Sequence, residues 1–466
     1  MLPGPFVVRR CGSSDPPCRS HQVVRAQRRV VVIGAAGLLV ALALRVVPLS
    51  GQVAVRNQGY VPFSEEPINY RGPVHDPVAQ LQQRLDSGRE RLDYEPGHGY
   101  LRSVLDKLGV PLSSQTLAFS KTSFQYRRIT PERPRALYFN DDVYVGQVHD
   151  GKALEFISFD PRQGAVFYIL DEQRADPPAF QRAELDCTQC HVAAGTRGVP
   201  GVLIRSVFPN PTGTQAALAP SFITGHQSPM RERFGGWYVT GVHGRARHMG
   251  NVVVRNPEQP EDIDRDGGAN VTDLSSRIDT ARYLTPHSDI VAQLVQAHQT
   301  QLHNLITLTN YQTRLALHVG APREQYERPA EELVRYLLFA NEAPLEDPVR
   351  GTSGFAEEFG ARGPRDSQGR SLRDFDLQTR IFKYPCSYLI YSEAFDAIPE
   401  PAKSYVYRRL FEILSGGDTS PDFARLTAAG RTAALEILIA TKPGLPPDWT
   451  NSRAPHSTQT KNRSHP

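Results

Sequence analysis

Five residues near the middle of the chain, Cys187–His191 (sequence CTQCH), constrain its fold and chemistry more than any other feature. The chain has 466 residues and five cysteines, and this run places two cysteines three residues apart with a histidine directly after the second. Cys386 stands alone in an apolar context and is predicted to be a buried thiol. One close pair stabilises a long chain little as a disulfide, so we expect the two thiols and the imidazole to share one site.

The run has the spacing of a covalent haem attachment site. Two thioethers, from Cys187 and Cys190, can reach the two vinyl-derived carbons of one porphyrin, and the next residue, His191, can turn its imidazole under the iron as the proximal ligand. The predicted cofactor is therefore one covalent haem c, because the chain contains no second such run.

Three other interpretations of the cysteine pair remain open. The pair could form a structural disulfide. A zinc site would need further ligands, and the sequence offers no second Cys-x-x-Cys or His-x₃-His pair. A thioredoxin-like redox pair would need a strand leading into the motif, whereas residues 177–182 are predicted to be loop or short helix.

The sixth ligand of the iron is predicted less directly. A methionine favours electron transfer, and Met249 follows the haem motif in a stretch rich in aromatic and basic residues. Met249 is the candidate distal ligand. Met230, His243 and His248 are alternatives, His298 and His303 are remote candidates, and an open site is a further possibility. The neighbouring groups that could pack on the porphyrin or neutralise its propionates are Trp237, Tyr238, Arg245 and Arg247.

Residues 262–273 have the spacing of a calcium-binding loop. Acidic residues occupy positions 1, 3, 5 and 12, glycine occupies position 6, and an asparagine occupies position 9. The candidate Ca²⁺ ligands are Asp262, Asp264, Asp266, Asn270 and Asp273. The segment before the loop is a helix breaker, so an acidic surface loop is the alternative.

The N-terminal region predicts export. The first 29 residues carry six arginines and one acidic residue, and they hold the basic excess of a chain whose net charge is +4. The apolar run Val30–Val47 follows, and its 18 residues would span about 27 Å as a helix. Arginines before the run predict a single-pass anchor with the bulk of the chain on the periplasmic side of the cytoplasmic membrane. Cleavage and release to the periplasm is the alternative, although Gln52 makes a poor cleavage site.

Periodicity predicts an α+β fold. Short β-rich runs separated by Asn, Asp and Gly turns predict a small antiparallel sheet before the haem motif, and 3–4 spacing of apolar residues predicts a mainly helical C-terminal half. The predicted regions are a basic cytoplasmic tail (1–29), a transmembrane anchor or signal segment (30–48), a linker (49–75), a helix plus antiparallel sheet region (76–180), a haem-binding region (181–273), a helical region (274–445) and a disordered tail (446–466).

The haem run resembles that of c-type cytochromes, and this resemblance covers five residues. Over a longer stretch the chain is similar to uncharacterised bacterial cytochrome c domain-containing proteins, on the blocks 136–146 (ALYFNDDVYVG) and 235–241 (GGWYVTG) together with the haem run. The resemblance implies haem binding and electron transfer but no substrate. The chain departs from small cytochromes because more than 250 residues follow its haem motif.

These features together predict an exported, membrane-anchored monohaem electron carrier with a redox partner protein of unknown identity. The basic excess is confined to the N-terminal tail, so nucleic-acid binding is not expected. One alternative is a haem-dependent oxidoreductase or peroxidase-like enzyme with an open iron site, in which His243, His248 or Arg245 would be a distal group. A haem-based sensor is another alternative.

Overall fold

The computed structural model describes residues 61–451. The predicted basic tail, the membrane anchor and the first part of the linker lie outside these residues, as does most of the predicted disordered tail. Within the described residues, no helix is both long and apolar enough to cross a membrane. The described residues belong to one compact unit, so the three central regions predicted from the sequence are parts of a single body.

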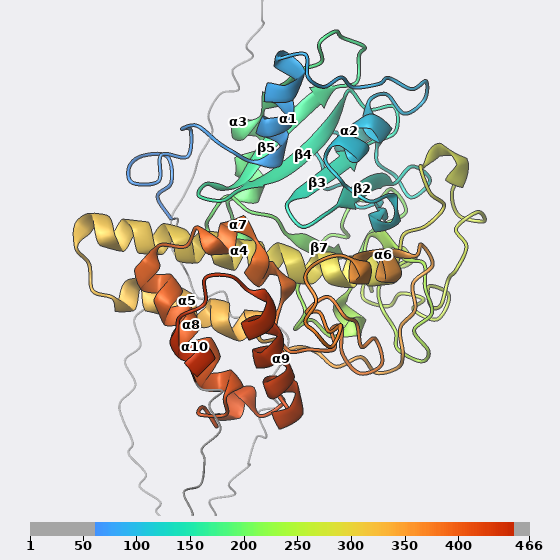
Figure 1. The fold of residues 1–466 in the computed structure, drawn as a ribbon. Helices are drawn as coiled ribbons and strands as arrows, with labels where there is room; N and C mark the ends of the chain where they lie inside the picture. The colour runs from blue at the N-terminus through green and yellow to red at the C-terminus, as the bar shows by residue number, and fades with distance from the viewer. Residues whose placement is uncertain (1–60, 452–466) are drawn as a thin grey trace, which may run out of the picture. The chain divides into compact units, whose positions relative to one another are not determined.

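A seven-stranded antiparallel sheet forms the centre of this body (Figure 1). Its strand order is β6-β5-β4-β3-β2-β1-β9. The strands are β1 (Thr116–Ala118), β2 (Arg135–Phe139), β3 (Val143–Gln147), β4 (Ala153–Asp160), β5 (Gly164–Asp171), β6 (Phe180–Arg182) and β9 (Trp237–Tyr238). A separate hairpin pairs β7 (Ile204–Val207) with β8 (Ser221–Thr224). The predicted antiparallel sheet before the haem motif is confirmed.

Tight turns set the register of the central hairpins. The Asn140 side chain accepts hydrogen bonds from the backbone N–H groups of Asp142 and Val143, which closes the β2–β3 turn. The Asp160 side chain likewise accepts from Arg162 and Gln163 between β4 and β5. Side chains alternate between the two faces of each strand, so the sheet buries an apolar set on both sides.

One face of the sheet is covered by two short helices, α1 (Pro77–Asp86) and α2 (Leu101–Lys107). Asp76 caps α1, accepting from the N–H groups of Val78 and Ala79. The Asp76 carboxylate also accepts a 2.6 Å hydrogen bond from the Tyr168 hydroxyl of β5, which ties the helix to the sheet. The apolar spacing in residues 76–108 predicts helix on either side of Pro96-Gly97, and α1 and α2 confirm this.

The other face is covered by α4 (Ile290–Val319), a 30-residue helix that runs beneath the sheet (Figure 1). Buried Asp289 caps its N-terminus and also accepts from the N–H groups of Thr352 and Ser353. Gly320, with φ of 65°, ends the helix in the left-handed conformation. The side chains of α4 are buried around nearly its whole circumference, so the helix forms the core between the sheet and the C-terminal helices.

The C-terminal helices pack on α4 in succession: α5 (Glu324–Leu337) contacts α4, α8 (Glu400–Leu414) contacts α5, and α9 (Ala428–Thr441) contacts α8. The remaining helices are α3 (Glu184–His191), α6 (Phe355–Ala361), α7 (Glu393–Asp396) and α10 (Asp448–Asn451). Short 3₁₀ helices occupy 112–114, 126–128, 194–196, 230–232, 280–282, 388–391 and 421–423. The prediction of a mixed α and β fold with helices after the sheet is confirmed.

Three stretches differ from the prediction. Residues 61–75, predicted as part of a linker, pack into the body because Val61, Phe63 and Tyr70 join Tyr311 of α4 in a buried cluster. Trp449 is buried against α8, so residues 446–451 are not a loose tail. Residues 344–375, whose Gly-, Arg- and Asp-rich composition predicts a loop, contain α6. In each case apolar side chains find long-range contacts that local composition does not reveal.

Candidate functional site

The two cysteines and the histidine of the predicted haem motif lie on α3. They occupy positions i, i+3 and i+4 of this helix, so their side chains project from one face. Cys187 is half-buried against the main core, Cys190 is exposed, and both thiols are free. The helix ends at His191. Its geometry therefore presents two thiols and an imidazole together.

His191 is oriented by a backbone carbonyl. Its Nδ1 lies 2.9 Å from the carbonyl oxygen of Gly201, and a carbonyl can only accept, so Nδ1 donates. The other ring nitrogen, Nε2, then carries a lone pair, and it has no hydrogen-bond partner within residues 61–451. Burial lowers the pKa of His191, which keeps the ring neutral. A neutral imidazole fixed through Nδ1 with Nε2 free is the state that ligates a metal.

A loop after α3 holds this carbonyl in place, and α4 holds the loop. The Asn304 side chain accepts from the N–H of Val202 at 2.9 Å and donates to the carbonyl of Val202 at 2.7 Å. The space beside Gly201 is so tight that a Cβ there would lie 2.1 Å from the Asn304 side-chain oxygen. The Gly201 N–H in turn donates to the His191 carbonyl at 3.0 Å. Asn304 is therefore a positioning residue for His191.

A pair of charged residues on the sheet lies beside the motif. Arg135 of β2 and Glu155 of β4 form a 3.2 Å ion pair, with side chains 14% and 15% exposed. Burial is the main cause that raises the pKa of the Cys187 thiol to about 12, and Glu155 adds to the rise while Arg135 opposes it. The Arg135 Nε is buried without a partner. This guanidinium thus has a free donor close to the motif.

The raised pKa argues against an activated redox cysteine. Redox-active pairs rely on a lowered thiol pKa at a helix N-terminus, whereas Cys187 is the fourth residue of α3. Contrary to the prediction of loop or short helix, a strand does lead into the motif, because residues 180–182 pair with β5 as β6. The strand alone does not make the site thioredoxin-like, because the pKa of the Cys187 thiol is raised and a redox-active pair needs a lowered one.

Residues 61–75, the N-terminal segment of the body, contact the first turn of α3 and the strand that precedes it. Arg71 pairs with Glu184 in the first turn of α3 at 3.1 Å. The Arg182 guanidinium donates to the backbone carbonyls of Tyr70 and Gly72 and stacks 4.9 Å from the Tyr70 ring centre. Residues 61–75 are therefore part of the support of the site.

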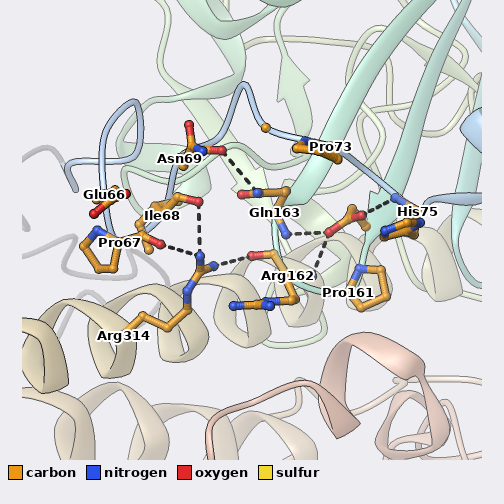
Figure 2. A pocket seen from close by; sticks show the side chains of 12 residues that line it. Glu66, Pro67, Ile68, Asn69, Pro73, His75, Pro161, Arg162, Gln163 and Arg314 are labelled. Atoms are coloured by element: carbon orange, nitrogen blue, oxygen red, sulfur yellow. Dashed lines mark hydrogen bonds between the residues drawn. The ribbon is translucent and has the colours of Figure 1, made fainter.

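This segment also borders a surface cavity of about 540 Å³ between residues 66–75, the β4–β5 turn and α4 (Figure 2). Arg314 extends from α4 and donates to the carbonyls of Arg162, Pro67 and Ile68. None of the three haem-motif residues lines this cavity, so it is separate from the candidate site.

The structure does not bring Met249 to α3. Met249 is fully buried in a separate cluster with Phe208, Val254 and Ile263, and the Ser206 hydroxyl lies 3.6 Å from its sulfur. Met230 is likewise buried, in the main core. Both methionines fill apolar cores, which is the commonest role of this flexible side chain.

The histidines predicted as possible ligands have partners of their own. His243 contacts the Ala246 carbonyl and accepts from the Asn270 N–H, and His248 accepts from the Gly250 N–H. His298 uses both ring nitrogens, toward His226 and Ser387. His303 stacks 3.8 Å from the Phe159 ring centre and contacts the Asp141 carbonyl. Arg245, the other proposed distal group, pairs with Asp347 at the surface.

The five predicted calcium ligands are not gathered around one point. Asp264 accepts from the Gly267 N–H, Asp266 pairs with Arg247, Asn270 bonds His243 and Gly244, and Asp273 bonds Ser275. Within residues 61–451 no group of three or more His, Cys, Asp or Glu side chains is placed to hold a metal ion.

The buried histidines predict a loss of stability in acid. Burial lowers the pKa of His298 and His248 to about 3 and that of His303 to about 4. The unfolded chain therefore binds more protons than the folded chain from about pH 6.5 downward, and the free energy of unfolding should fall over that range. The fall should reach at most about 1.4 kcal/mol per pH unit for each histidine.

Urea denaturation between pH 7.5 and 4.5 measures this slope. His248→Asn keeps an acceptor for Gly250 and should make the slope shallower, whereas exposed His318→Asn should leave it unchanged. Equal slopes in the wild type and His248→Asn would show that His248 is not a buried neutral base.

Sequence reasoning missed the groups that surround the motif: Gly201, Asn304, Arg135 and Glu155. Gly201 follows His191 by ten residues and Asn304 follows by 113, and no local pattern links either of them to the haem run. A buried asparagine on an otherwise core-facing helix is the one signal that could have drawn attention to Asn304.

The donor set on α3 fits a covalent haem, since two thiols and one neutral imidazole with a free Nε2 stand on one helix face. Comparison of the chain with protein-family models, with curated proteins and with solved structures finds no match.

Proposed function

We propose that the chain is a monohaem c-type cytochrome that transfers electrons. The observation that carries the proposal is the state of His191: its Nδ1–H donates to the Gly201 carbonyl, and its Nε2 has no partner within residues 61–451. It lies on the same helix face as two free thiols, next to Cys190 and one turn after Cys187. Among the alternatives weighed from the sequence, a zinc site would need ligands that the described residues do not gather here.

In this proposal each residue has one role. Cys187 and Cys190 would hold the haem by thioether links, and His191 would ligate its iron. The haem supplies one-electron redox chemistry when bound. Asn304 and Gly201 fix the imidazole plane, and Arg135, which pairs with Glu155, would offer a positive charge to a propionate.

The setting of the proposed cytochrome follows from the N-terminal sequence. The arginine-rich tail and the apolar run Val30–Val47 favour a single-pass anchor that leaves the body on the periplasmic side, with release to the periplasm as the alternative. Covalent haem attachment of this kind takes place on exported chains, so the predicted export and the predicted haem site agree. The partner is a redox protein, and a tether keeps the cytochrome near membrane oxidoreductases.

A second function, a haem-dependent oxidoreductase or sensor with an open iron site, is favoured by one observation. Met249 is buried in the cluster around Phe208, apart from the main core that Cys187 borders, so it is not placed as a sixth ligand. An iron with one protein ligand would leave its distal side to a small molecule.

Absorbance of the reduced holoprotein with and without carbon monoxide separates the two functions. An electron carrier with two strong ligands should give a low-spin spectrum that carbon monoxide does not change. A high-spin spectrum that shifts on adding carbon monoxide would replace the carrier with the enzyme or sensor. A preparation without any haem spectrum would overturn both.

A further inference from the structure

An exposed group of aromatic and basic side chains lies on the loop between β1 and β2, and no role in haem attachment uses it. Phe124 is 53% exposed and Tyr126 is 45% exposed, although most large apolar side chains of the body are buried. On the same loop Lys121 is partly exposed, and Arg127 and Arg128 are exposed. We call these five residues the Phe124 surface.

The three cations of the Phe124 surface lie together without an acidic partner. The Arg127 Nε donates a 3.5 Å hydrogen bond to the Tyr126 hydroxyl. This bond and the charge of Lys121 both lower the pKa of Tyr126, so the two cations lie close to one ring. Within residues 61–451 none of the three cations forms an ion pair. The surface therefore presents an uncompensated positive charge around two aromatic rings.

Phe124 is held in position by its two neighbours in the chain. The Ser123 hydroxyl donates to Glu155 Oε1 at 2.5 Å, and Gln125 Nε2 donates to the same oxygen at 3.0 Å. Gln125 Nε2 also donates to the Ala153 carbonyl at 2.9 Å. Both neighbours are thus tied to the sheet, and the exposed ring between them is presented on a fixed backbone. A preorganised aromatic side chain loses little conformational entropy on binding.

The Phe124 surface is supported by the ion pair that lies beside the haem motif. Glu155, which holds the two neighbours of Phe124, pairs with Arg135 at 3.2 Å. The Arg135 Nη1 also donates to the Thr122 carbonyl at 3.2 Å. In the sheet Glu155 is directly opposite Ile169 of β5, the strand on which α3 packs. The loop is therefore anchored one strand away from residues that α3 contacts.

The same ion pair acts on the haem motif itself. Burial is the main cause of the raised pKa of Cys187 and of the lowered pKa of His191, and the charges of Glu155 and Arg135 act on both groups. His191 contacts the ring of Phe167, which belongs to the same strand and the same face as the residue opposite Glu155. One ion pair thus joins the Phe124 surface to the motif.

The composition of the Phe124 surface indicates the kind of partner that fits it. Aromatic and arginine side chains are enriched at the centres of protein interfaces, and opposite charges steer two proteins together. At the edge of the surface Arg133 lies 3.9 Å from Asp150, and Glu132 is an exposed acid, so the positive charge is concentrated around Phe124 itself. A protein with acidic groups around an apolar centre is complementary to this arrangement.

We propose that the Phe124 surface docks an acidic face of the redox partner protein, which exchanges one electron with the haem held on α3. The inference rests on the proposed function. Attraction between the acidic face and the three cations forms the encounter, and contact with the two aromatic rings orients it. One electron then passes between the redox centre of the partner and the haem iron, and no bond is formed or broken.

Oxidation of the reduced full-length holoprotein by two charged probes tests the role of the surface in electron transfer. Ferricyanide is an anion and hexaammineruthenium(III) is a cation, and each takes one electron from the iron. Arg128→Glu should lower the rate with ferricyanide about fivefold at low salt and raise the rate with hexaammineruthenium(III). Both effects should shrink at high salt, because the charges are then screened.

The matched control is Arg408→Glu, which makes the same change in net charge at an exposed arginine of α8. Both rates should equal those of the wild type. Haem-loaded protein in which Arg128→Glu leaves the ferricyanide rate unchanged, or in which Arg408→Glu lowers it equally, would overturn the inference and leave the proposed function intact.

Binding of dye-labelled polyglutamate, an acidic polypeptide, tests the surface without using the haem. The full-length wild type should bind this probe at low salt, Arg128→Glu should bind it about fivefold more weakly, and Arg408→Glu should bind it like the wild type. No binding by the wild type, or an equal loss in both variants, would overturn the inference. Protein without covalent haem would instead overturn the proposed function, and polyglutamate would still show whether the surface takes an acidic polypeptide.

A membrane surface is the other occupant that aromatic and basic side chains suit. Irradiation of the full-length protein in phosphatidylglycerol vesicles that contain a photoreactive lipid separates the two occupants. Cleavage after Lys121 and Arg127 releases residues 122–127, which contain Phe124 and Tyr126. This peptide should carry no lipid. Lipid attached to it would overturn the docking of a protein and assign the surface to the bilayer.

Discussion

Replacing both cysteines of α3, by Cys187→Ser and Cys190→Ser, should give a folded protein whose polypeptide retains no haem on a denaturing gel. The loss should be complete, because serine cannot form the thioether links while the imidazole of His191 alone holds haem only reversibly. The fold should survive, since Cys190 is exposed and Cys187 only borders the main core. A haem stain of the denaturing gel, beside a total protein stain, measures both outcomes.

The matched control is Cys386→Ala, which removes a thiol that is fully buried in the main core far along the chain. Its stain should equal that of the wild type. Haem that stays with the double serine variant after denaturation would mean that the attachment lies elsewhere, and the role of the CTQCH run would be lost.

Asn304→Leu should both destabilise the protein and disturb the haem environment. Leucine leaves the N–H and carbonyl groups of Val202 buried without partners, at a cost of about 3 kcal/mol in the free energy of unfolding. The Gly201 carbonyl should then shift, and the His191 ring with it, so the reduced spectrum should lose intensity or change spin state. Urea denaturation and absorbance of the reduced holoprotein measure the two effects.

Asn310→Leu on the same helix separates the two effects. Asn310 donates one hydrogen bond, to the Ala397 carbonyl, and does not contact the loop after α3. Asn310→Leu should lower the free energy of unfolding by about 1 kcal/mol and leave the absorbance spectrum of the reduced holoprotein unchanged. Identical spectra for the wild type and Asn304→Leu would show that Asn304 does not position the imidazole.

The elements with strong local patterns could be predicted from the sequence. The 3–4 spacing of apolar residues in 288–319 predicted a helix that the structure has at α4, and the Asn, Asp and Gly turns of 137–170 predicted hairpins that are present as β2 to β5. The CTQCH run was also visible, because its spacing is short, and its assignment to haem stays a prediction.

The surroundings of the motif could not be predicted, because they depend on contacts across long stretches of chain. The Gly201 carbonyl and the Asn304 amide become neighbours only when α4 packs on the sheet. Met249 was predicted as an iron ligand because it follows the haem motif in the sequence. In the structure its side chain is buried in the cluster around Phe208. In the loop with calcium-type spacing, Asp266 and Asn270 contact Arg247 and His243, partners that the spacing does not reveal.

The mass of one tryptic peptide tests covalent haem attachment most directly. Cleavage after Arg182 and Arg197 releases residues 183–197, which contain both thiols and His191. For full-length wild-type protein made alongside a working haem-ligation system, this peptide should carry the added mass of one haem and absorb visible light. Recovery of the peptide without the mass of a haem, colourless and alkylated at both cysteines, would contradict the proposed cytochrome.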